Sequence, residues 1–193
     1  ASLFKTEVII ERELYGIDHH SVFPGALIQE FIEADYSFGI HTAHPLTGEA
    51  RYLVIEVVQG LGGGLRSYGC PGLPHQFVFD KKTQIITRTA EADKKLKYVL
   101  ILFAPLIWDI SSEKTNGNDD IFAKEKIPGI VPMMVDIALR IETLYGQPQD
   151  IEGVIRIIND AKDIFIVQSL VQKIISSSSP VSAKEKVVLL DYM

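Results

Sequence analysis

Two apolar segments near the end of the chain, joined by a short polar one, constrain the fold more than any other feature. Residues 151–158 and 164–170 have the composition of strands, and residues 159–163 between them supply a turn. Antiparallel partners have residue numbers that sum to twice the turn centre, so a pair of Glu152 with Gln168 puts the centre at residue 160, inside the predicted turn. We therefore predict a hairpin in which these two side chains are neighbours.

A carboxylate beside an amide oxygen on one rigid sheet face is a suitable environment for a magnesium ion. Asp150 and Glu152 are two residues apart on a strand, so their side chains point to the same face. Mg²⁺ takes oxygen ligands of this kind, and waters and nucleotide phosphates complete its octahedron. From spacing alone, an edge strand whose Asp-x-Glu faces water is the commoner explanation, so both interpretations stay open here.

Strand-like segments also recur through the first two thirds of the chain, separated by turn residues. The predicted strands are residues 26–32, 37–42, 52–58, 77–79, 84–89 and 98–108, of which the last is expected to be buried. The polar residues 111–120 predict an exposed loop and a boundary between lobes. The chain is therefore expected to be rich in β-structure.

One helix is indicated strongly. Apolar residues recur at helical spacing from Ile130 to Tyr145, and Gly146 followed by Pro148 predicts its C-terminal cap. Beyond the last hairpin, the serines of residues 176–179 predict a linker, and residues 187–190 a short terminal strand or tail.

Composition limits the partners. The 193 residues include 19 Lys and Arg against 25 Asp and Glu, a formal net charge of −6, and 47% are hydrophobic. These values exclude disorder and a coiled coil, and they argue against nucleic acid or an anionic membrane as partner because both bind clustered Lys and Arg. No segment approaches the roughly 18 consecutive apolar residues of a membrane helix. The single cysteine, Cys70, permits no internal disulfide, and we expect a cytoplasmic protein.

A glycine-rich segment, residues 60–64, follows a predicted strand as phosphate loops do. The Lys-Ser/Thr of a P-loop is missing, and Leu65 stands where a dinucleotide fingerprint needs its third glycine. Two interpretations of this segment remain open, a loop that presents N–H groups to an anion and a plain wide turn.

Cys70 and His75 could form a nucleophile pair, but no third group is available to orient them, which favours a structural thiol.

Ordered motifs connect these segments to a known family. They are Gly16-Ile17-Asp18-His19, Ala26-Leu27-Ile28-Gln29-Glu30, His41-Thr42 with Pro45, Glu56-Val57-Val58-Gln59-Gly60-Leu61-Gly62, Leu144-Tyr145-Gly146, Pro148-Gln149-Asp150-Ile151-Glu152-Gly153 and Val167-Gln168-Ser169. In this order they resemble the nucleotide-binding domain of the phosphoenolpyruvate synthase and pyruvate phosphate dikinase family, and look most similar to the C-terminal region of the α-glucan water dikinases. The resemblance runs to about residue 173 and is poor over residues 90–127.

The resemblance implies an α+β fold, an ATP-grasp-like lobe with a largely antiparallel sheet and flanking helices. In that family ATP lies between two lobes, and the dikinases transfer phosphates through a phosphohistidine to glucan and to water. Residues 1–173 are expected to be the C-terminal part of the ATP-grasp domain, and residues 174–193 a linker and tail. The first lobe and the phosphohistidine domain, expected elsewhere in the same parent chain, would be partners, with the α-glucan bound elsewhere.

The resemblance also assigns ATP and Mg²⁺ as cofactors and implies roles residue by residue, with no catalytic residue in this fragment. Gln29, Glu30 and Ile32 would contact the adenine and ribose, and Glu56, Gly60 and Gly62 would lie on the phosphate side. Asp150 and Gln168 would make further contacts with ATP. The metal ligands would be Glu152 and Gln168.

Departures from the family pattern leave a second hypothesis open. Gly63 replaces a glutamate, Leu170 replaces an arginine, and residues 115–119 look like the remnant of an arginine-bearing acidic segment. Arginine gives a bidentate, always charged contact with phosphate that leucine cannot supply. The chain is therefore expected to be either part of an ATP-dependent glucan phosphotransferase, whose full-length form could reside in a plastid, or a catalytically degenerate nucleotide-binding or structural module.

Overall fold

The computed structural model describes residues 4–65, 71–104, 107–115, 120–126 and 128–172. The chain divides into two units, residues 1–31 and residues 32–193, and each is described by itself. The predicted linker and tail at residues 176–179 and 187–190, and Cys70, lie outside the described residues.

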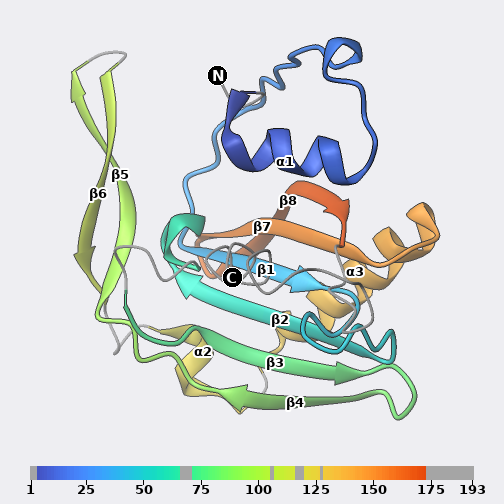
Figure 1. Cartoon of the computed structure of the whole chain (residues 1–193). Coiled ribbons are helices and arrows are strands. Elements are labelled where there is room, and N and C mark those ends of the chain that lie inside the picture. Colours follow the sequence, from blue (N-terminus) through green and yellow to red (C-terminus); the bar gives the residue numbers. More distant parts are fainter. Residues whose placement is uncertain (1–3, 66–70, 105–106, 116–119, 127, 173–193) are drawn as a thin grey trace. The chain divides into compact units, whose positions relative to one another are not determined.

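The second unit is built on a six-stranded antiparallel sheet with the strand order β4-β3-β2-β1-β7-β8 (Figure 1). Its strands are β1 (Tyr36–His41), β2 (Tyr52–Gln59), β3 (His75–Asp80), β4 (Ile85–Ala90), β7 (Gln149–Ile158) and β8 (Ala161–Val171). The predicted strands at residues 37–42, 52–58, 77–79 and 84–89 are confirmed to within two residues. Together with the helices described below, the sheet confirms the expected α+β, largely antiparallel architecture.

Two helices, α2 (Ile121–Lys124) and α3 (Ile130–Tyr145), pack on one face of this sheet and enclose the hydrophobic core. Alternate residues of each strand point to this face; the core side chains with less than 2% exposure include Phe38, Leu53, Ile55, Phe77, Phe122, Met134 and Ile151. The intervening positions, on the opposite face, carry polar side chains such as Ser37, Glu56 and Glu152 together with buried valines such as Val54 and Val58.

The predicted helix and its cap are both confirmed. α3 ends at Tyr145, and Gly146 adopts the left-handed conformation at φ +67° while its N–H donates to the Glu142 carbonyl over 2.9 Å. A side chain at this position would be strained, because L-residues other than glycine rarely adopt positive φ.

The β7–β8 hairpin turns at Asn159 and Asp160, both with positive φ, as the tight turns that match strand twist require. Ile158 pairs with Ala161, so the regular register would place Val167 opposite Glu152. A bulge in β8 shifts the pairing by one residue, and Glu152 lies opposite Gln168. The sequence-based pairing is thus confirmed, although its turn is shorter than expected.

The buried strand predicted at residues 98–108 is wrong. The segment belongs to a separate two-stranded ribbon, β5 (Leu96–Ala104) and β6 (Ile107–Lys114), which projects from the end of the sheet in Figure 1. A uniformly apolar run has no alternation that marks its midpoint, so one long strand and two shorter ones look alike in sequence. β6 also takes up residues 111–114 of the predicted loop, and residues 116–119 lie outside the described residues.

The first unit contains α1 (Thr6–Leu14) and a single 3₁₀ turn, η2 (His19–Ser21). The strand predicted at residues 26–32 is wrong, because residues 22–34 form no helix or strand and Leu27 and Ile28 are 83% and 94% exposed. Strand propensity does not suffice without a partner to take the backbone hydrogen bonds, and no described strand pairs with this segment.

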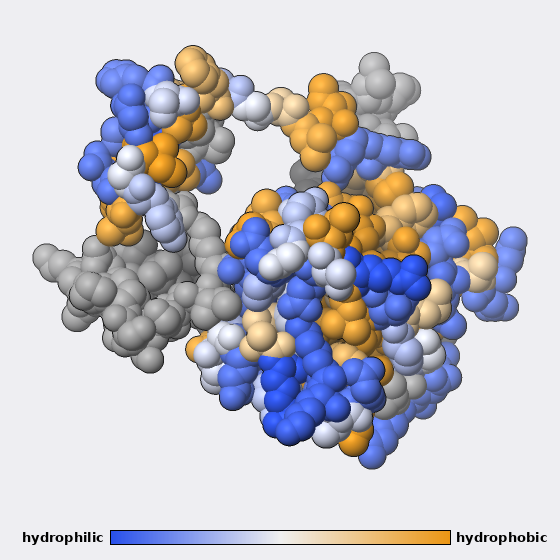
Figure 2. Space-filling model, turned by 90° about the vertical axis from the view of Figure 1, so that its right-hand side faces the viewer, coloured by the Kyte–Doolittle hydropathy of each residue, from blue (hydrophilic) through white to orange (hydrophobic). Residues whose placement is uncertain are grey.

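Charged side chains form ion pairs and hydrogen bonds at the end of the sheet where β3 turns into β4. Lys81 Nζ donates to the Thr42 carbonyl over 2.7 Å and to both carboxylate oxygens of Glu142 over 2.7 and 2.8 Å. Arg51 forms a two-point pair with Asp80, which holds the pKa of that carboxyl far below its usual range. This turn lies at the hydrophilic lower end of the surface in Figure 2.

Among the described helices, none combines the length and apolarity needed to cross a membrane.

Candidate functional site

Strand register aligns polar residues across the face of the sheet that is opposite α3. Gly39 pairs with Glu56 on one side and with Glu152 on the other. Directly paired residues of antiparallel strands project to the same face. The row, here called the acidic row, consists of Gln76, Glu56, Gly39, Glu152 and Gln168.

The two ends of the acidic row are separate polar groups. Glu152 and Gln168 are direct neighbours, with a Cβ separation of about 5 Å. Glu56 lies two strands from Glu152, about 10 Å away, which exceeds what one ion with bonds of about 2 Å can bridge. Glu56 Oε1 instead accepts a hydrogen bond from Gln76 Nε2 over 3.0 Å. A cation site in this row is therefore confined to the Glu152 and Gln168 side.

Asp150 lies beside His41 in the next row along the same face. The two residues pair across β1 and β7, and His41 Nδ1 is 3.6 Å from Asp150 Oδ1. Asp150 is two residues from Glu152, so both carboxylates point to this face. Within the described residues, no group of three or more His, Cys, Asp or Glu side chains is arranged to hold a metal ion.

The glycine segment folds back over this face as a turn held on both sides. Gly60 N donates to the Asp35 carbonyl over 2.8 Å, Leu61 N to the Tyr98 carbonyl over 2.9 Å, and Ser37 Oγ to the Gly60 carbonyl over 2.7 Å. Gly60 has φ +76°, and a Cβ there would collide with the Tyr98 carbonyl oxygen. The N–H groups of Gly60 and Leu61 are thus engaged within the protein.

The same segment reaches the acidic row. It continues as the 3₁₀ turn η3 (Gly62–Gly64), and a Cβ built on Gly62 would lie 3.8 Å from Ser37 Cβ. Leu65 Cδ1 would lie 3.9 Å from a Cβ on Gly39, so Leu65 covers the gap between Glu56 and Glu152. At Gly63, a Cβ would lie 3.1 Å from the Tyr98 ring.

The structure brings most of the sequence-predicted site residues onto one face of the second unit. These are Glu56, Gly60, Gly62, Asp150, Glu152 and Gln168. Ile32 belongs to the same unit and is half-buried, whereas Gln29 and Glu30 belong to the first unit, where both are exposed.

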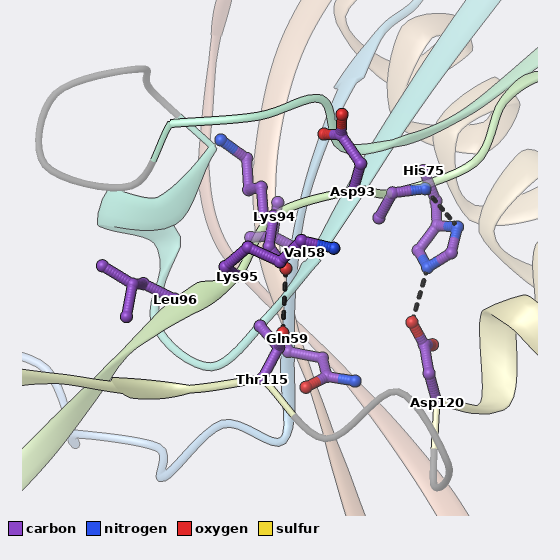
Figure 3. Close-up of a pocket in the computed structure, with 10 residues that line it drawn as sticks. Val58, Gln59, His75, Asp93, Lys94, Lys95, Leu96, Thr115 and Asp120 are labelled. Atoms are coloured by element: carbon purple, nitrogen blue, oxygen red, sulfur yellow. Dashed lines mark hydrogen bonds and ion pairs between the residues drawn. The ribbon is translucent and has the colours of Figure 1, made fainter.

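Sequence reasoning missed a buried polar network on the core side of the sheet. His75, 1% exposed, contacts Asp120 Oδ2 through Nε2 over 2.7 Å, and its Nδ1 accepts the Ala92 N–H over 3.1 Å (Figure 3). The second bond requires Nδ1 to be unprotonated, so Nε2–H donates to Asp120. Asp120 Oδ1 accepts the N–H of Phe122 over 2.9 Å and the hydroxyl of Tyr36 over 3.3 Å.

These contacts determine how both acids of the network titrate. Burial alone would raise the pKa of Asp120, but the hydrogen bonds from His75, Phe122 and Tyr36 lower it below its ordinary value. Burial raises the pKa of the Tyr36 hydroxyl, and the nearby Asp120 carboxylate adds to this. An aspartate directly before Ile121 is the type of residue that caps a helix, and this was the available sequence signal.

A cavity of about 240 Å³ opens beside this network (Figure 3). Besides His75 and Asp120, it is lined by Lys94, which is 7% exposed, and by Thr115, whose Oγ1 donates to the Lys94 carbonyl over 2.8 Å. No sequence-predicted site residue lines it. It lies on a different part of the fold from the acidic row.

An antiparallel α+β lobe with helices on one face, and a glycine turn over carboxylates on the other, is the architecture of an ATP-grasp-like lobe. The chain belongs to the pyruvate phosphate dikinase AMP/ATP-binding domain family, whose model matches residues 1–188.

Several relatives share this domain as part of a longer chain. The chain is 31% identical to α-glucan water dikinase 2 of Arabidopsis thaliana, aligning over 88% of this chain and 15% of that protein. It is 31% identical to the chloroplastic α-glucan water dikinase of Solanum tuberosum, over 79% and 12%. It is 29% identical to a probable phosphoenolpyruvate synthase of Archaeoglobus fulgidus, over 87% and 21%. The chain thus spans about a fifth or less of these three relatives.

Proposed function

We propose that this chain forms part of the ATP site of a glucan water dikinase, with Mg²⁺ held at Glu152 and Gln168. The observation that carries the proposal is the β8 bulge, which places the carboxylate directly beside the amide. A carboxylate and an amide oxygen are the ligands that Mg²⁺ accepts alongside waters and phosphates, so the donor set fits this ion.

In this proposal the chain binds and orients the nucleotide. Asp150 and Gln168 contact ATP, Glu56 and the Gly60–Gly62 turn form the phosphate side, and Gln29, Glu30 and Ile32 line the adenine and ribose. The ion, when bound, neutralises charge on the phosphates as they are transferred. The remaining half of the site and the phosphohistidine would come from other parts of the parent chain, with residues 1–173 forming this lobe and residues 174–193 a linker and tail.

The test is Glu152→Gln in the full-length protein that contains this chain. The variant loses a charged oxygen ligand, so we expect transfer of the ATP β-phosphate to the protein and to glucan to require about tenfold or more Mg²⁺, with unchanged folding. Asp160→Asn is the matched control, because Asp160 is an exposed carboxylate in the turn of the same hairpin. An unchanged Mg²⁺ requirement in Glu152→Gln would overturn the metal assignment.

A second candidate, a nucleotide-binding or structural module without catalysis, is favoured by Gly63 and Leu170. Leu170 lies opposite Asp150 and is 54% exposed, so this part of the face has an apolar side chain where an arginine would pair with phosphate. Calorimetric titration of the full-length protein with ATP and Mg²⁺ separates the two. Binding without phosphate transfer supports the nucleotide-binding module, and absence of binding removes both nucleotide-binding functions. We expect the parent protein to act in the cytoplasm or in a plastid.

A further inference from the structure

A single arginine of β7 shares the face that carries the acidic row. Arg156 is four residues from Glu152 on the same strand, so both side chains point away from the core, and their Cα atoms are about 13 Å apart. The residues between them confirm the alternation, because Ile155 is fully buried in the core and a Cβ on Gly153 would meet the Phe38 ring there.

The guanidinium of Arg156 lies over an aromatic ring of the neighbouring strand. Its Cζ is 4.8 Å from the centre of the Phe165 ring. Phe165 pairs with Val154, which is two residues nearer to Glu152. One row of side chains, Val154 and Phe165, therefore lies between Arg156 and the Glu152 and Gln168 pair on this face.

Arg156 has hydrogen-bonding capacity that the described residues do not use. Its Nη2 is 3.5 Å from Asp163 Oδ2 in a half-exposed ion pair, which is a weak interaction. Its Nε is buried and has no hydrogen-bond partner in the described part of the chain. Because the buried Nε cannot itself contact an incoming group, ligand binding would use the remaining N–H groups of the guanidinium, whose ion pair with Asp163 is weak.

Stacking on Phe165 also prepares the group for binding. A guanidinium held against an aromatic ring is fixed in orientation and loses less rotamer freedom when it binds. The side chain is 36% exposed, so a ligand can reach it. A planar guanidinium with free N–H donors matches the oxygens of a phosphate.

We propose that Arg156 binds a phosphate group of the nucleotide whose metal ion lies at Glu152 and Gln168. The proposal rests on the function proposed above and adds a positive group to a face that carries Glu56, Asp150 and Glu152. A diphosphate or triphosphate is long enough to join the two positions. Arg156 would then supply, from the opposite side of the Glu152 and Gln168 pair, the charge that Leu170 does not.

The test is NMR titration of the 193-residue chain, labelled with ¹⁵N, with MgATP, with inorganic pyrophosphate and with adenosine. We expect MgATP to shift the Arg156 Nε–H and the Gln168 side-chain amide, pyrophosphate to shift the Arg156 Nε–H, and adenosine to shift neither. The affinity for MgATP should fall roughly tenfold to a hundredfold in Arg156→Gln, the usual effect of losing a hydrogen bond to a charged group. Arg156→Lys should restore part of the affinity, because it keeps the charge but not the planar fork.

Arg140→Gln is the control, because this arginine is exposed on α3 and pairs within its own helix with Asp136. Shifts at Gln168 without a shift at Arg156, or an Arg156→Gln variant that binds MgATP like the wild type, would overturn the proposal and leave the proposed function standing. A shift at Arg156 with pyrophosphate, combined with no shift at Gln168 with MgATP, would retain the phosphate site and overturn the nucleotide function. Titrations that move neither group overturn the proposal for Arg156, whereas the proposed function is tested in the full-length protein, which supplies the remaining half of the site.

Discussion

Replacing Asp120 by asparagine should destabilise the fold even though the side chain keeps its shape. The two carboxylate oxygens of Asp120 accept hydrogen bonds from three donors, the Phe122 N–H, the Tyr36 hydroxyl and the His75 Nε2–H. An amide has one oxygen and one NH₂ group, so any orientation of asparagine directs N–H groups at a buried donor. His75 cannot relieve this by moving its proton to Nδ1, because the Ala92 N–H already occupies that position.

The magnitude follows from the groups left without a partner. One buried donor without an acceptor costs about 1–3 kcal/mol, so Asp120→Asn should lower the free energy of unfolding by this amount. Asp120→Ala also removes the cap of α2, which is worth about 1 kcal/mol, and should cost about 2–4 kcal/mol. Aspartate and asparagine are equally good as ordinary helix caps, so the large effect of the asparagine variant is specific to the buried network.

Urea denaturation followed by far-UV circular dichroism measures these differences. Asp18→Asn is the matched control, since Asp18 caps η2 through the His20 N–H at an exposed site, and it should change stability by less than about 0.5 kcal/mol. The folded-state pKa of Asp120 is below its ordinary value, so its stabilisation is present above about pH 4 and is lost as the pH falls through the folded value. The gap between wild type and Asp120→Asn should therefore shrink at about pH 3. An asparagine variant as stable as the wild type at neutral pH would refute the assignment of the His75 proton.

Two further changes test the glycines that shape the candidate site. Gly153→Ala should lower the free energy of unfolding by about 1–3 kcal/mol, because its Cβ would meet the Phe38 ring and lie 2.6 Å from the Phe165 carbonyl oxygen; denaturant titration measures this, and a neutral effect would contradict the packing around the bulge. Gly60→Ala should detach the glycine turn from β5, because alanine disfavours φ +76° and its Cβ would collide with the Tyr98 carbonyl; hydrogen exchange at the Leu61 amide should then accelerate, and unchanged protection would argue against this attachment.

Sequence predicted those elements whose determinants are local. The cap at Gly146 and the turn at Asn159 and Asp160 depend on a few adjacent residues with positive φ. The pairing of Glu152 with Gln168 was predicted with a turn centre at residue 160, whereas the observed turn alone would place Val167 opposite Glu152. The prediction holds because the β8 bulge, which gave no sequence signal, shifts the register by one residue. Asp150 and Glu152 were predicted from their spacing of two residues on one strand, and Glu56 from the resemblance to the family.

The remaining features depend on contacts that sequence spacing does not encode. His75 and Asp120 are 45 residues apart in sequence, and Tyr36 and Asp120 are 84 apart. No short sequence motif can therefore predict their hydrogen bonds. The segment at residues 26–32 has strand composition, yet a strand also needs a neighbour, which is a property of the whole fold. Arg156 gave no sequence signal, because sequence spacing does not show that its guanidinium lies over the Phe165 ring.

The β8 bulge also determines which changes of length the last hairpin can accept during evolution. β7 has 10 residues and β8 has 11, and the extra residue in β8 is what moves Gln168 opposite Glu152 in place of Val167. Deleting one residue between the turn and Val167 would leave the pair intact only if the bulge disappeared at the same time. A relative could equally keep the pair with a regular hairpin and a turn one residue longer. Turn length and bulge should therefore covary among homologues, even where every other residue of the hairpin differs.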